Sequence, residues 1–196
     1  MANGRVITGF SKPYVAKYTA TETTGGYTVA YSNGQVLARG VELTIEPETT
    51  DNNNFYADNV IAENEAGIFT GGSLNLTVDG LKDAATRLIF GLPAASDGWI
   101  DYDNSQAVPH VGFGAVVRVQ EAGTVSYVPL ILTKIQFNDN GMSAATQEDQ
   151  IDWQAQELTA QVLRDETVKQ CWKKLGEAQT TEAAAEAKIK TFLNIS

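Results

Sequence analysis

The chain has 196 residues, which suits one domain, or one domain with a small appendage, with a real hydrophobic core. Hydrophobic residues make up 43% and charged residues 19%, and this excludes a disordered or collagen-like chain. The formal net charge of -10 disfavours tight wrapping of nucleic acid, because phosphate binding needs clustered cations. No apolar run approaches the roughly 20 residues that cross a bilayer, and no secretory signal is visible, so we expect assembly in the cytoplasm without a membrane partner.

The first predicted element is a hairpin. Residues 27–31 alternate in polarity, and they are followed by the dipeptide Asn33-Gly34 and by the apolar-rich residues 35–39. Asn-Gly supplies the positive φ angles that a two-residue turn needs. The pattern therefore predicts that the chain reverses at Asn33-Gly34.

A further strand is predicted at residues 41–46, where Val41, Leu43 and Ile45 alternate with polar side chains. This period of two indicates one face in the core and one in water. A polar, turn-rich loop is predicted next, at residues 47–54, and it leads into a predicted strand at residues 55–63. The candidate loop residues are Pro47, Glu48, Asp51, Asn52, Asn53 and Asn54.

A strand at residues 72–79 and a helix of about three turns follow. Apolar residues then recur at helical spacing, Asp79 is positioned to cap the helix, and Gly91 with Pro93 ends it. We expect the helix to pack on the sheet through Leu81, Leu88 and Ile89.

The second half of the chain predicts a hairpin of residues 114–120 and 125–137, and a last strand at residues 153–163. Helices are predicted at residues 166–175 and 181–193. The expected fold is mainly β (α+β), an antiparallel sandwich or partly open barrel with one flanking helix. We expect a β domain over residues 1–164 and a helical appendage over residues 165–196.

Motifs for catalysis and metal binding are weak throughout. Cys171 and His110 are the only residues of their types, so neither a disulfide nor a Cys/His zinc set can form within the chain. Gly112-Phe113-Gly114 resembles the start of a dinucleotide fingerprint, but a predicted strand follows it instead of a helix. We therefore predict no catalytic residue, no metal ligand and no cofactor.

The acidic residues are unevenly distributed. Between Gly40 and Lys82 the chain has eight carboxylates and no Lys or Arg. A solvated outer face explains this run, and so does a surface that must not bind a polyanion. The residues concerned include Glu42, Glu46, Asp58, Glu63 and Asp79.

The ordered run of features resembles one protein family. Residues 41–46, the loop through Asp51, Phe55-Tyr56-Ala57-Asp58-Asn59, the strand 72–79 with its helix, and His110-Val111-Gly112-Phe113-Gly114 look like the major tail, or tail tube, proteins of long, flexible-tailed bacteriophages. Residues 127–134 and 156–163 continue the likeness, which covers roughly residues 5–164. Order and spacing carry the resemblance, since no single motif is diagnostic.

The resemblance implies a structural virion protein of the tail, whose hexameric rings stack into a tube for DNA ejection. It implies that the loop at residues 47–54 reaches the neighbouring ring, and that some of the five acidic residues named above face the lumen. The implied partners are other copies of the chain, the tape measure protein and the tail terminator and distal tail proteins. DNA would pass through without specific binding.

Two other functions stay open at this point. A monomeric carbohydrate- or ligand-binding β-sandwich predicts an aromatic-lined pocket, with Trp99, Tyr102 and Trp153 as candidate platforms. An enzyme predicts perturbed titratable groups gathered in a cleft.

Overall fold

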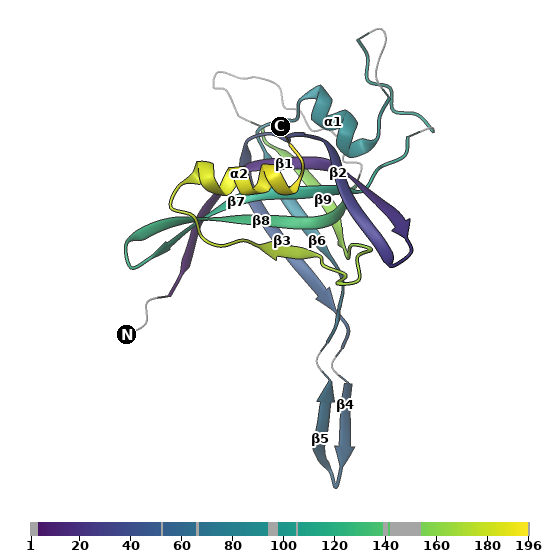
Figure 1. Ribbon diagram of the computed structural model, residues 1–196, viewed down its shortest axis with the longest axis vertical. Helices are drawn as coiled ribbons and strands as arrows, with labels where there is room; N and C mark the ends of the chain where they lie inside the picture. The colour runs from purple at the N-terminus through teal and green to yellow at the C-terminus, as the bar shows by residue number, and fades with distance from the viewer. Residues whose placement is uncertain are drawn as a thin grey trace.

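The computed structural model describes residues 4–51, 53–65, 67–93, 98–104, 106–138, 141 and 154–195. Within these ranges the chain is mainly β, with an antiparallel eight-stranded sheet that does not close into a barrel. The predicted fold class is confirmed. Figure 1 shows the sheet folded into two layers whose strands cross, as in a sandwich.

The first layer contains the longest strands, which pair in the order β2-β1-β7-β8. Its strands are β1 (Val6–Thr23), β2 (Gly26–Val36), β7 (Val111–Glu121) and β8 (Thr124–Phe137). The short β10 (Lys173–Leu175) pairs with the middle of β8. The predicted hairpin of residues 114–137 is present, and Ala122 and Gly123 at its turn both have positive φ, as a tight turn requires.

The second layer contains β9 (Gln156–Leu163), β6 (Phe69–Val78) and β3 (Gly40–Thr49). It joins the first layer because residues 134–137 of β8 pair with β9. The core lies between the layers, where Phe113 and Leu132 meet Leu74, Leu76 and Leu158. All five of these side chains are buried.

Helix α1 (Asp83–Phe90) covers one end of this core and ends at Gly91, which has a φ of 67°. Ile89 is fully buried, whereas Leu81 and Leu88 are partly buried against the same cluster. Two expectations about this helix are wrong. It is eight residues long instead of three turns, and Asp79 does not cap it, because the Asp79 carboxylate binds the backbone N–H and guanidinium of Arg39.

Helix α2 (Glu182–Phe192) covers the outer face of the first layer (Figure 1). Its buried residues Ala185 and Ile189 pack on Tyr14 and Val116. A Cβ on Gly114 would lie 2.4 Å from Ile189 Cγ2, so this position of β7 has room for glycine alone. Gly112 therefore makes room for the Tyr31 ring, and Gly114 makes room for Ile189 of α2. These close contacts explain the two glycines without a dinucleotide fingerprint.

The Asn33-Gly34 prediction is wrong, because β2 continues through this dipeptide. Ser32 pairs with Lys17 and Gln35 with Val15, so Asn33 and Gly34 together oppose one residue and form a bulge. Asn33 has positive φ, but Gly34 does not, and a two-residue turn of the expected type needs both. The chain reverses instead between Thr23 and Gly26.

The helix predicted at residues 166–175 is also absent, since this segment forms turns and then β10. Asp165 Oδ1 accepts hydrogen bonds from the backbone N–H groups of Thr167 and Cys171. Such bonds from a side chain to nearby backbone groups compete with helix formation. The second predicted helix is present as α2, with the Thr181 hydroxyl as its N-terminal cap.

Candidate assembly surfaces

Four large apolar side chains that are more than half exposed lie on one projecting hairpin, which we call the arm. It consists of β4 (Asn53–Ala57) and β5 (Val60–Glu65), and it extends beyond the ends of β3 and β6 (Figure 1). Asp58 and Asn59 both have positive φ and form its turn. The predicted continuous strand at residues 55–63 is therefore wrong, because the chain reverses at Asp58-Asn59.

The predicted loop at residues 47–54 is mostly strand. Pro47 and Glu48 belong to β3 and pair with Gly72 and Gly71 of β6. Asp51 is exposed between β3 and β4, while Asn53 and Asn54 begin β4. Asn52 lies outside the described residues. The feature that projects is thus the arm at residues 53–65, farther along the chain than the predicted loop.

The arm carries apolar side chains on both of its faces. Tyr56 pairs with Ile61 and Ala57 pairs with Val60, and adjacent residues of a strand point to opposite faces. Phe55, Tyr56, Val60 and Ile61 are all more than half exposed. Since an isolated two-stranded hairpin is only marginally stable in water, such a surface is typical of a protein contact.

A polar face covers the outer side of the second layer. The paired residues across β3, β6 and β9 form three rows, which are Glu42-Thr77-Glu157, Thr44-Asn75-Thr159 and Glu46-Ser73-Gln161. None of these side chains is cationic. Glu157 was not among the predicted residues, although the alternation of polar and apolar residues in β9 is a signal that points to it.

The five acidic candidates are not brought together. Glu42 and Glu46 lie on the polar face, whereas Asp58 and Glu63 are exposed on the arm. Asp79 follows β6, and its contacts with Arg39 lower the pKa of the carboxyl, first through the Arg39 backbone N–H at 2.9 Å. Asp79 is thus held ionised in an exposed ion pair with Arg39.

An apolar groove opens where the two layers diverge. One wall belongs to β1, β7, β8 and β10, the other to β3, and the volume is about 640 Å³. Val41 was expected in the core but is exposed at this groove, because a bulge next to Gly40 takes it out of the alternation. Leu43 and Ile45 line the β3 wall and are partly buried.

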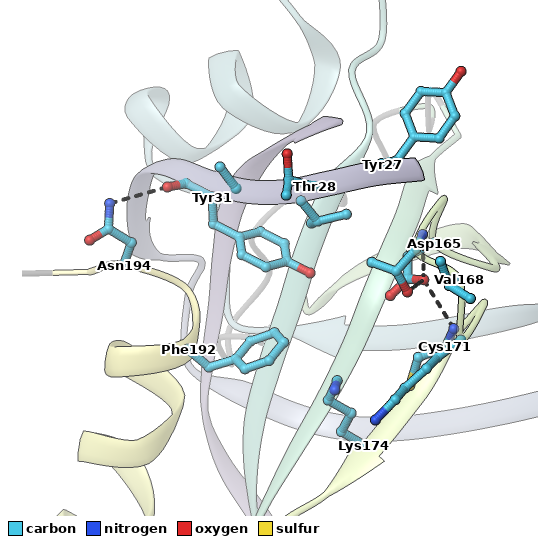
Figure 2. Close-up of a pocket in the computed structure, with 13 residues that line it drawn as sticks. Tyr27, Thr28, Tyr31, Asp165, Val168, Cys171, Lys174, Phe192 and Asn194 are labelled. Atoms are coloured by element: carbon cyan, nitrogen blue, oxygen red, sulfur yellow. Dashed lines mark hydrogen bonds between the residues drawn. The ribbon is translucent and has the colours of Figure 1, made fainter. Parts of the chain in front are cut away.

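A second hollow, of about 700 Å³, lies between β2 and the C-terminal segment. Figure 2 shows the rings of Tyr31 and Phe192 on one side and Asp165, Val168 and Cys171 on the other. The Tyr31 hydroxyl is engaged, since it donates to the carbonyl of Thr133 at 2.8 Å. The predicted platforms Trp99 and Tyr102 do not line this hollow, and Trp153 lies outside the described residues.

The perturbed titratable groups lie mainly where the C-terminal segment meets β1. Hydrogen bonding from the Tyr14 hydroxyl, at 2.5 Å, lowers the pKa of Glu186 to about 2, with help from Lys190 and Lys12. Burial, and then the bond to Glu186, raises the pKa of Tyr14 to about 12. Farther along β1, burial and a bond to Glu166 raise the pKa of Tyr18. These contacts join one segment to another. Burial also raises the pKa of Tyr31, which lines the hollow beside β2.

Among the described residues, no cluster of His, Cys, Asp or Glu could hold a metal ion, and no helix is long and apolar enough to span a membrane. His110 is half-buried, and its pKa is lowered by burial and then by Lys134. The candidate functional surfaces among the described residues are the arm, the polar face, the apolar groove and the hollow beside β2. In comparisons with known proteins, no protein-family model matches the chain and no curated protein matches it by sequence.

Proposed function

We propose that the chain is the tube subunit of a long, flexible bacteriophage tail, which assembles into stacked hexameric rings around a DNA channel. The arm is the observation that carries this proposal. A monomer gains nothing from projecting Phe55, Tyr56, Val60 and Ile61 into water, whereas a self-assembling subunit buries them against a neighbour. The sandwich and the resemblance over residues 5–164 support the same function.

The polar face supports the channel part of the proposal. Glu42, Glu46 and Glu157 lie there among neutral polar side chains. Sixfold repetition around a narrow lumen would focus their negative potential and keep a passing polyanion from binding the wall. Other partners in this proposal are the tape measure, tail terminator and distal tail proteins.

Assembly of the purified chain tests the proposal. Size-exclusion chromatography and negative-stain microscopy should show rings or tubes at high protein concentration. A variant in which an Asn-Gly turn replaces residues 51–66 should stay folded and fail to elongate. A wild-type chain that remains monomeric at every concentration would reject the proposal, and normal tubes from the shortened variant would show that the arm is not the stacking element.

The channel assignment has its own test. Changing Glu46 and Glu157 to Lys should leave the tubes intact but make them retain DNA at low salt, where screening is weakest. The matched control changes Glu22 and Glu121 to Lys, because both are exposed on the first layer, away from the arm and the polar face. DNA retention that is equal for both pairs, or absent from the first, would remove the polar face from the channel.

The hollow beside β2 favours one alternative, a ligand-binding module. Tyr31 and Phe192 line it with their rings, together with Tyr27 and Lys174. Titration with oligosaccharides, followed by tyrosine fluorescence, distinguishes this function, because a binding module responds as a monomer. A response that is abolished by Phe192→Ala in a chain that never assembles would favour the alternative.

A further inference from the structure

We infer that the apolar groove between the two layers is the docking site for the arm of a second copy of this chain. This inference rests on the proposed function, and it names the surface that receives the arm. The groove and the arm are both apolar surfaces that this chain leaves exposed, and they fit each other in shape and in charge.

The shape argument begins with the two faces of the arm. Tyr56 and Ile61 point to one side and Val60 to the other, so a flat surface could cover only one set. The groove offers two walls. One is lined by Val117, Val119, Val128 and Leu130, and the opposite wall by Val41, Leu43 and Ile45.

The size of the groove is also suitable. Its volume of about 640 Å³ lies within the range of about 300–1,000 Å³ that is typical of binding pockets. Ile7, Val41 and Leu175 line it and are each more than half exposed, although they are large apolar residues. Insertion of an apolar hairpin would bury both surfaces, and burial of apolar area is the main driving force of association.

The charges of the two surfaces are complementary. The arm carries Asp58 and Glu63 and has no Lys or Arg anywhere in residues 53–65. Arg5 and Lys173 line the groove with a single carboxylate, Glu42. Arg5 donates a hydrogen bond to the Ser126 hydroxyl and Lys173 lies over the Trp172 ring, but neither cation pairs with a carboxylate in the ion pairs of the described residues. Their charges are therefore not compensated by an acidic side chain there, and an acidic arm would supply one.

The arm does not fill the groove of its own chain. β3 forms one wall of the groove, and the arm continues away from the sandwich beyond the end of that strand (Figure 1). Each subunit therefore presents a donor and an acceptor at different places. A contact of this heterologous type links subunit to subunit and can propagate through a stack.

The test uses two variants that each remove one side of the contact. Ile7→Glu places a carboxylate in the groove and leaves the arm intact, so this variant can only donate. Tyr56→Ser with Ile61→Ser removes one of the two apolar faces of the arm and leaves the groove intact, so this variant donates its arm poorly and accepts one normally. All three residues are more than half exposed, and circular dichroism should confirm unchanged folding.

Val6→Glu is the matched control for the groove. Val6 is 61% exposed against 71% for Ile7, and as its neighbour in the strand it points to the opposite face. Ile68→Ser, at the base of the arm, is the control for the arm variant. Both controls should assemble as the wild-type chain does.

We expect each test variant alone to associate at least about tenfold more weakly than the wild type and to form no tubes. Mixed, the two should form one complementary pair, of two subunits or two rings, that grows no further. Analytical ultracentrifugation measures this pairing directly. Variants that fail to pair, or Ile7→Glu that elongates like Val6→Glu, would overturn the inference.

The same experiment separates the two proposals. If the wild type and Ile7→Glu both form tubes, the docking inference fails and the tube function stands. If the wild type forms no tubes but the two variants still pair, the docking inference stands and the tube function fails. If arm-to-arm contact drives assembly instead, the arm variant fails alone and the mixture does not rescue it.

Discussion

Helix α2 and the arm are two additions to the same sandwich, and they treat their apolar residues in opposite ways. On α2, Ala185 and Ile189 are fully buried against the first layer. On the arm, Tyr56, Val60 and Ile61 are more than half exposed. The helix packs on its own chain, and the apolar side chains of the arm are exposed to solvent.

This difference separates folding from assembly. Burial of apolar area on α2 is complete in the monomer, so its residues contribute to the free energy of unfolding. The apolar side chains of the arm stay exposed when the chain folds, so they add little to the free energy of unfolding. They can be buried only by contact with another molecule. Substitutions on α2 should therefore lower the free energy of unfolding of the monomer, whereas substitutions on the arm should weaken assembly.

The largest effect on stability is expected from Ile189→Ala. The side chain is fully buried beneath α2, and truncation at such a site costs about 2–5 kcal/mol through lost transfer energy and a cavity. Urea unfolding of the monomer measures the change. A cost below about 0.5 kcal/mol would mean that α2 is not part of the cooperative fold.

A somewhat smaller loss is expected from Gly114→Ala. The new Cβ would lie 2.4 Å from Ile189 Cγ2, so the helix must move, and overpacking of this kind costs about 1–3 kcal/mol. Gly4→Ala is the control, because a Cβ there meets no atom within 4 Å. Equal unfolding curves for the two variants would contradict the close packing of α2 on β7.

Acid should loosen α2 before it unfolds the sandwich. The folded-state pKa of Glu186 is lowered to about 2 from an ordinary 4.5, so the carboxylate contributes stability that is present above pH 4.5 and is lost as pH falls toward 2. Hydrogen exchange of the α2 amides in this window measures the effect. Glu186→Gln should flatten the pH dependence there, and an unchanged profile would show that Glu186 does not hold the helix.

The smallest effect on stability is expected from Ile61→Ala. This residue is exposed on the arm, so the free energy of unfolding should change by no more than about 0.5 kcal/mol. Assembly should nevertheless weaken, because the removed surface is the one offered to a neighbour. A loss of monomer stability close to that of Ile189→Ala would show that the arm is packed within its own chain and would erase the contrast between the two regions.

Local signals were enough for the elements whose geometry is local. The alternation of residues 72–79 predicts β6, and Gly91 predicts the end of α1, because each pattern depends on near neighbours in the chain. The turn at Ala122-Gly123 closes a hairpin between strands that are adjacent in sequence. The mainly β class follows from the same periodicities.

Contacts between distant segments decided the rest. Asn33-Gly34 is a bulge and not a turn because β1 runs for 18 residues and continues to pair beyond the dipeptide. Residues 173–175 form a strand because the free side of β8 supplies their partners. The sequence alone determined which side chains alternate, but only pairing across the fold decided which of them are buried, which form the polar face and which project on the arm.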